Sequence, residues 1–186
     1  MKTVSETAII EETIKKSRFI AAMNPCQSEA QAHAILRELH QQHPNANHIV
    51  FAYRINSDKG LLCRFHDAGE PSGTAGKPIF HHLEGKQLIN VMIVVVRYFG
   101  GIKLGAGGLA RAYGNSARQA IEAAELKDYV KMAEVTLALE YSQMKHLEYQ
   151  LKKLDGKIIA QDYSDKIRVK LSLPAENVQI LKDLTL

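Results

Sequence analysis

The sequence predicts an α+β protein with two domains. Segments with alternating or continuous apolar residues, typical of strands, are interspersed with segments whose apolar residues recur at helical spacing. The chain has 186 residues, of which 46% are hydrophobic, enough for one domain or two small ones with buried cores. Because the pattern changes near residues 127–131, we expect domains at 1–130 and 131–186.

In the first domain, turn residues separate the expected elements. Residues 4–24 predict two strands with a turn at Lys15-Lys16-Ser17. Ser28 has the pattern of a helix N-cap, and Pro44 ends that helix. Further along we expect strands at 48–55 and 61–65 around a turn at 56–60, a short helix at 79–83, a buried strand at 91–99, and a helix from 109 to about 126.

The second domain predicts the order strand, helix, strand, strand, helix. The segments are a strand at 135–139, a helix with the apolar face Met144, Leu147, Leu151 and Leu154, a hairpin at 157–173 around Ser164-Asp165, and a helix at 177–184. This is a ferredoxin-like order without the last strand. Truncation, a different register, or an edge filled by another chain would each explain the difference.

Composition argues against several functional classes. The sequence has no run of about 18 apolar residues and no apolar signal stretch, so we expect a cytoplasmic protein without a membrane span. Cys26 and Cys63 lack ligand-like spacing and are interpreted as small buried hydrophobes. The histidines form no metal-ligand pattern. We therefore expect no metal and no cofactor, and the sequence leaves the oligomeric state open.

Positive charge is concentrated around a glycine-rich loop at residues 100–108. The net charge is only +4, but residues 85–121 contain no Asp or Glu, so their cations are expected to stand without neutralising neighbours. Glycines allow a ligand to approach the backbone, and the free N–H groups at a helix start attract phosphate or carboxylate. The alternative is that the glycines only permit a tight loop. The predicted anion-binding residues here are Arg97, Lys103, Gly105, Gly107, Gly108 and Arg111.

A second glycine-rich loop spans residues 67–76. Asp67 and Glu70 are the candidates for acid–base or metal chemistry. The favoured alternative is that Asp67 forms the turn and that Ser72 or Thr74 caps the next helix. The predicted anion- or nucleic-acid-binding set is completed by Ser72, Gly73, Thr74 and Gly76.

Three stretches, at residues 15–19, 67–78 and 94–113, together resemble the YigZ/IMPACT family. The resemblance covers most of residues 1–125 and is specific, because the stretches are long and occur in the family's order. It implies an N-terminal α+β domain with a left-handed βαβ crossover, similar to domain IV of elongation factor G and to the GHMP kinases. It also implies a C-terminal ferredoxin-like domain similar to domain V of that factor.

The leading functional hypothesis is a cytoplasmic, non-catalytic protein that binds an anionic partner. The family resemblance implies RNA, the ribosome or a translation-control component as that partner, and it supplies no catalytic assignment. One alternative is an enzyme acting on a phosphorylated or carboxylated small molecule, with Asp67 or Glu70 as the acid–base group. A further alternative is a protein–protein adaptor for a regulatory partner.

Overall fold

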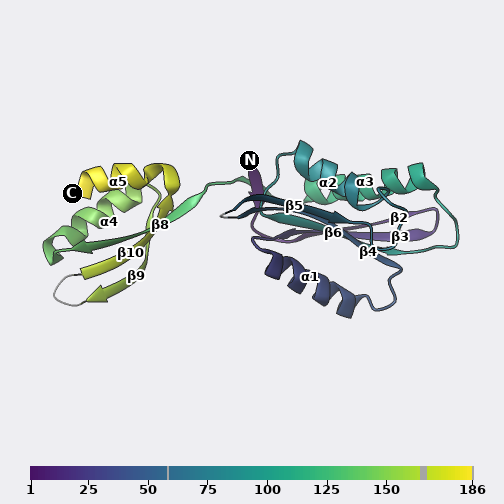
Figure 1. The fold of residues 1–186 in the computed structure, drawn as a ribbon, viewed down its shortest axis with the longest axis horizontal. Helices are drawn as coiled ribbons and strands as arrows, with labels where there is room; N and C mark the ends of the chain where they lie inside the picture. Colours follow the sequence, from purple (N-terminus) through teal and green to yellow (C-terminus); the bar gives the residue numbers. More distant parts are fainter. Residues whose placement is uncertain (58, 164–166, 186) are drawn as a thin grey trace. The chain divides into compact units, whose positions relative to one another are not determined.

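A computed structural model describes residues 1–57, 59–163 and 167–185. The chain divides into two compact units, Met1–Tyr129 and Val130–Leu186 (Figure 1). Each unit combines a sheet with helices, so the predicted α+β class is confirmed. The turn residues expected at Asp58 and at Ser164-Asp165 lie outside the described residues.

A five-stranded antiparallel sheet forms the centre of the first unit. Its order is β2-β3-β6-β4-β5, so β6, the last of these five strands in the sequence, lies in the middle of the sheet. Every residue from Val91 to Arg97 is buried, because helices cover both faces of this strand. The strands are β2 (Ala8–Ile14), β3 (Ser17–Pro25), β4 (His48–Ser57), β5 (Gly60–His66) and β6 (Val91–Tyr98).

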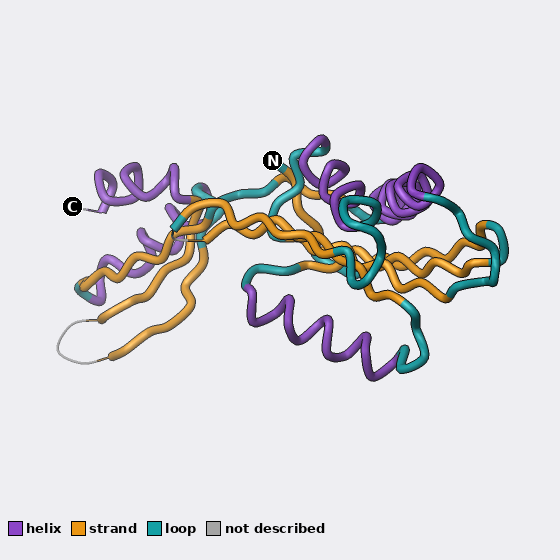
Figure 2. Tube along the Cα trace, turned by 45° about the vertical axis from the view of Figure 1, so that its right-hand side comes forward, coloured by secondary structure: helices purple, strands orange, loops and turns teal. Residues whose placement is uncertain are grey.

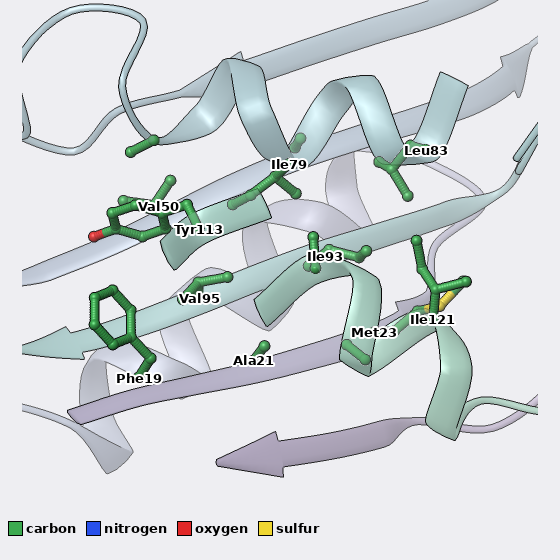
Figure 3. Close-up of a cluster of buried hydrophobic side chains, with 14 of the residues drawn as sticks. Phe19, Ala21, Met23, Val50, Ile79, Leu83, Ile93, Val95, Tyr113 and Ile121 are labelled. Carbon is green, nitrogen blue, oxygen red and sulfur yellow. The ribbon is translucent and has the colours of Figure 1, made fainter. Parts of the chain in front are cut away.

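Three helices pack on this sheet. Figure 2 shows α1 (Glu29–Gln42) on one side, and α2 (Gly76–Gly85) and α3 (Ala106–Ala123) on the other. The larger apolar cluster lies under α2 and α3, and Figure 3 shows Tyr113 and Phe19 within it. Their rings meet edge to face with centroids 5.4 Å apart, so α3 is fixed against β3 beside the second glycine-rich loop.

Local geometry explains where the elements begin. Lys15 and Lys16 both have positive φ, 46° and 66°, and form the predicted tight turn between β2 and β3. The helix α3 begins at Ala106 rather than after Gly108, which corrects the expected length of the second loop. Gly105 takes a φ of 73°, and its carbonyl accepts the first helical hydrogen bond, from Leu109.

Two short strands were not predicted from the sequence. β1 (Lys2–Val4) pairs antiparallel with β7 (Leu126–Asp128), and Val4 is buried in the larger cluster. The N–H of Tyr129 also donates to the carbonyl of Met1 at 3.0 Å. The beginning and the end of the first unit are therefore hydrogen-bonded neighbours.

The second unit has the element order expected from the sequence. β10 lies between β8 and β9 and is antiparallel to both. Along β10 the buried residues alternate with the exposed cations Arg168 and Lys170. The elements are β8 (Met132–Leu139), α4 (Met144–Lys153), β9 (Lys157–Tyr163), β10 (Ile167–Pro174) and α5 (Val178–Thr185), with short 3₁₀ turns at Tyr141–Gln143 and Ala175–Asn177.

The two cysteines occupy different environments. Cys26 is buried as expected, and burial raises the pKa of its thiol, whereas Cys63 is exposed on β5, contrary to expectation. Within the described ranges, no helix has the length and apolar character needed to cross a membrane. No cluster of three His, Cys, Asp or Glu side chains suited to a metal occurs among the same residues.

Candidate functional site

A buried ion pair connects the first glycine-rich loop to β6. Arg97 Nη1 donates to Glu70 Oε1 at 2.5 Å, and these side chains are only 5% and 4% exposed. The hydroxyl of Tyr113 donates to the same oxygen at 2.7 Å. Burial, followed by the contact with Glu70, raises the pKa of Tyr113, so this phenol stays a donor at neutral pH. The three side chains satisfy one another where an unpaired charge would be costly.

The same arginine also supports the start of the second loop. Arg97 Nη2 donates to Ser17 Oγ at 3.3 Å, and this Oγ accepts the N–H of Gly100 at 3.2 Å. A Cβ on Gly100 would lie 2.0 Å from the carbonyl carbon and oxygen of Lys16. Gly100 is therefore required by the close approach of two backbone segments, as the tight-loop alternative predicts.

A cavity of about 380 Å³ lies between this ion pair and the start of α3. Glu70 and Arg97 line it together with His48, Phe99, Lys103 and Gly105. Arg97 Nε is buried and has no hydrogen-bond partner in the described part of the chain. This atom is shielded, so the unsatisfied donor belongs to the buried cluster and is not open to the cavity.

His48 presents a defined ring nitrogen to this cavity. Its Nδ1 is 2.9 Å from the carbonyl oxygen of Ala68, which only accepts, so Nδ1 carries a proton. In the neutral ring Nε2 is then an acceptor, 3.7 Å from Glu70 Oε1.

A second cavity, of about 320 Å³, lies on the other side of Leu104. Leu104 lines both cavities, and the second one is also lined by Lys15, Gly108 and Arg111. The carboxylate of Glu12, on β2, lies beside a later part of α3. There it accepts hydrogen bonds from Asn115, Ser116 and Gln119. The start of α3 is therefore flanked by two hollows, each with a cation at its edge.

The predicted cations fall into two groups. Arg97 is neutralised by Glu70, and Arg118 by Glu122 at 2.8 Å one helical turn away, so the expectation of unneutralised charge is wrong for both. Lys103 and Arg111 are exposed, and no ion pair involves either of them among the residues that the structure describes. Lys15, which lines the second cavity with Arg111, is likewise exposed and in no ion pair among the described residues.

In the first glycine-rich loop, the carboxylate of Asp67 accepts hydrogen bonds from backbone N–H groups. Its Oδ1 accepts from the N–H groups of Ala75 and Gly76 at 3.1 and 2.8 Å, and Oδ2 accepts from Gly73 at 2.9 Å. Burial alone would raise the pKa of Asp67, but these donors outweigh it and hold the pKa below its ordinary value. Asp67 is thus the turn former, and the expected cap from Ser72 or Thr74 is not made.

The structure separates the predicted site residues into three places. Thr74 Oγ1 donates to the carbonyl of Pro71 at 2.6 Å, and a Cβ on Gly76 would lie 2.8 Å from the backbone of His66. Glu70, Arg97, Lys103 and Gly105 line the first cavity, and Gly108 and Arg111 the second. The residues that line neither are Asp67, Ser72, Gly73, Thr74, Gly76 and Gly107.

Sequence reasoning missed His48, Phe99, Tyr113 and Ser17. His48 begins β4, which lies next to β6 in the sheet but far from it in sequence. Ser17 follows the Lys15-Lys16 turn, and its role comes from the hydrogen bonds that it accepts from Arg97 and Gly100. Two signals were available: Ser17, Phe99 and Tyr113 all lie within the stretches that resemble the family, and Phe99 is an aromatic residue directly before the glycine pair.

Comparison with known proteins agrees with this architecture. The model of the Impact N-terminal domain matches residues 15–121, and the model named "Domain of unknown function (DUF1949)" matches residues 137–184. The IMPACT family member YigZ of Escherichia coli strain K12 is 39% identical over 170 residues, which cover 91% of this chain and 83% of YigZ. The chain belongs to the IMPACT family. The residues that line the two cavities all lie in the part that matches the Impact N-terminal domain, except Ile14, which directly precedes it.

Two solved structures also match this chain. A crystal structure described as that of a hypothetical protein matches with a TM-score of 0.73 at 36% identity, covering 98% of this chain and 89% of the other. A structure of Yih1, described there as a two-domain translational regulator, matches at 27% identity over 66% of this chain and 47% of Yih1, with a TM-score of 0.37.

Proposed function

We propose that this IMPACT-family chain is a cytoplasmic, non-catalytic protein that binds phosphate groups of RNA, on the ribosome or in a translation-control complex. The observation that carries the proposal is the uncapped start of α3. No side chain caps this helix, and its first turn has no acidic residue. By contrast, Ser28 Oγ accepts the N–H of Gln31 at the start of α1, and Glu29 follows it.

An uncapped helix start favours an external anion. The first N–H groups of a helix have no partner within it, and the helix dipole places partial positive charge there. At α3 these groups belong to exposed residues, Ala106 and Gly107. Lys103 and Arg111 add full charges on the two sides of Leu104. Phosphates along a nucleic-acid backbone suit such a row of positive groups.

The same contacts argue for binding rather than acid–base catalysis. Asp67 has both oxygens engaged by backbone N–H groups, and its lowered pKa keeps it ionised at neutral pH. Glu70 Oε1 already accepts from Arg97 and Tyr113. A carboxylate held in this way stabilises the loop and is poorly placed to exchange protons with a substrate.

Salt dependence of RNA binding tests the proposal. We expect Lys103→Ala/Arg111→Ala to weaken binding of the full chain to ribosomes or structured RNA. The slope of log affinity against log salt should fall by about 0.7–0.9 for each phosphate that the variant no longer neutralises. The matched control is Lys145→Ala/Lys152→Ala, which removes two exposed cations of the second unit.

The outcomes are distinct. Binding that is absent at both low and moderate salt would overturn the proposal, as would equal weakening by the test and control pairs. If a protein partner is recovered from cell extract after nuclease treatment, and RNA is not bound, the chain is an adaptor instead.

We also propose that each of the two units has the specific fold that the family resemblance implies. The connection β3-α1-β4 would be the left-handed crossover, as in domain IV of elongation factor G. The second unit would be ferredoxin-like, as in domain V. The parallel direction of β3 and β4, both antiparallel to β6 between them, supports the first assignment, and crossover handedness in an experimental structure tests it.

A further inference from the structure

We infer that the cavity beside Phe99 takes one unpaired nucleotide of RNA, with its base against the Phe99 ring and its phosphate at the start of α3. The inference rests on the proposed function and adds which part of the RNA is recognised. It is carried by the groups that line the cavity, by the exposed ring, and by the oxygen of Glu70 that accepts no hydrogen bond from the described residues.

Two kinds of group line this cavity. Lys103 and Gly105 belong to the uncapped start of α3, which favours an anion. Glu70, whose Oε2 accepts no hydrogen bond from the described residues, and His48 Nε2, an acceptor in the neutral ring, instead favour hydrogen-bond donors. A ligand that carries an anionic group and separate hydrogen-bond donors satisfies both kinds of group.

Arg97 offers no free donor to a ligand in this cavity. Its Nη1 and Nη2 are engaged by Glu70 and Ser17, and Nε, which has no partner in the described ranges, is shielded. Glu70 Oε2 is therefore the group beside this arginine that can accept from a ligand. The edge of a nucleobase carries hydrogen-bond donors that suit such an acceptor.

Phe99 provides a platform for the flat face of a base. Its side chain is 45% exposed although it directly follows the buried strand β6. The ring makes a cation–π contact with Arg97, whose guanidinium carbon lies 5.6 Å from the ring centroid. The backbone N–H of Phe99 also donates to Asn47 Oδ1 at 2.8 Å. An aromatic ring that is exposed yet anchored loses little freedom when a base stacks on it.

The volume fits the inference. About 380 Å³ lies within the range of cavities that bind small organic groups, roughly 300–1,000 Å³. An unpaired base can enter such a space, whereas a base inside a duplex has both faces covered by its neighbours. The site therefore selects single-stranded or bulged RNA.

Substitution of Phe99 separates stacking from electrostatics. We expect Phe99→Ala to weaken binding of a short single-stranded RNA by roughly 5- to 150-fold, the range for loss of one stacked base. Because stacking involves no counterion release, the factor should be the same at low and moderate salt, and the salt slope should stay unchanged. Phe65→Ala is the matched control, since Phe65 is 43% exposed in the same unit and lines neither cavity.

Small probes define the ligand class directly. The full chain is titrated with adenosine monophosphate, uridine monophosphate, ribose 5-phosphate, inorganic phosphate and a zwitterionic amino acid, and binding is followed by nuclear magnetic resonance. We expect shifts at Phe99 and Leu104 with the nucleotides, together with an Overhauser contact between base and Phe99 ring protons. The other probes should give weak shifts or none.

Each result decides something. One test uses a set of RNAs, each lacking the base at a different single position. If all of them bind as tightly as the intact strand, the inference is overturned while the phosphate-binding proposal stays intact. Stronger binding by the amino acid would assign the cavity to a zwitterion instead. If RNA does not bind at all, the proposed function fails, and the mononucleotide titration still decides whether the cavity takes a nucleotide.

Discussion

Two glycine-rich loops of the first unit, at residues 67–75 and 99–105, both lead into a helix but end in different states. In the first, the carboxylate of Asp67 accepts three backbone N–H groups and closes the start of α2. In the second, no side chain caps α3, and Lys103 stands without an ion pair in the described structure. Glycine content alone therefore does not create an anion site. We expect an anion site where the chain leaves its own N–H groups without an internal acceptor.

The largest effect should come from Glu70. This residue of the first loop pairs with Arg97, which lies beside the second loop. We expect Glu70→Ala to lower the free energy of unfolding by about 3–5 kcal/mol, because it leaves the Arg97 charge buried without a partner. Urea denaturation followed by circular dichroism measures this change.

A double variant sharpens that test. Glu70→Leu/Arg97→Met replaces the pair with apolar side chains and should recover most of the lost stability. If Glu70→Ala alone stays within about 0.5 kcal/mol of the parent, the effect of an ordinary surface substitution, the ion pair is not the link between the loops.

A smaller effect is expected at Asp67. Asp67→Asn replaces one acceptor oxygen with an amide donor facing backbone N–H groups, which should cost about 1.5–3 kcal/mol of unfolding free energy. Affinity for RNA should be unchanged, because Asp67 lines neither cavity. If fully folded Asp67→Asn protein bound RNA more weakly than the parent, the first loop would take part in RNA binding, contrary to this expectation.

The pH dependence of this effect has a defined sign. The folded-state pKa of Asp67 lies below its ordinary value of 3.8, so the folded protein binds this proton less readily than the unfolded chain. The stabilisation is complete above about pH 5 and is lost as the pH falls through the unfolded and then the folded pKa. The stability difference between the parent and Asp67→Asn should therefore shrink below about pH 4.

The smallest effects should come from single glycines. A Cβ on Gly76 would lie 2.8 Å from the backbone of His66, so Gly76→Ala should cost about 1–3 kcal/mol through overpacking. A Cβ on Gly107 would meet Arg111 Nη1 at an ordinary 3.5 Å, so Gly107→Ala should be neutral or stabilising by up to about 1 kcal/mol. Thermal unfolding of both variants checks the contrast, and the reverse order would refute it.

Much of the fold followed from local signals in the sequence. The Lys15-Lys16 turn, the Ser28 cap and the apolar run of β6 each leave a pattern within a few residues. The strands β1 and β7 left none, because three residues are too few to show a period and their pairing joins opposite ends of the unit.

The candidate site was predictable only in part, because electrostatic pairing is a property of three-dimensional neighbours. The sequence located Lys103 and the glycine-rich loop correctly beside the start of α3. It did not reveal that Glu70 neutralises Arg97, since the two are 27 residues apart along the chain. A stretch without acidic residues therefore did not imply unpaired cations.

The hydrogen bond between Tyr129 and Met1 has a practical consequence for engineering. Since β1 and β7 bring both ends of the first unit together, a short linker between them would allow circular permutation with new termini elsewhere. The turn at Lys15-Lys16 is one opening point, though it would disturb the packing on Gly100. Mechanical load applied between residues 1 and 129 would peel apart this small sheet before it reached the five-stranded one.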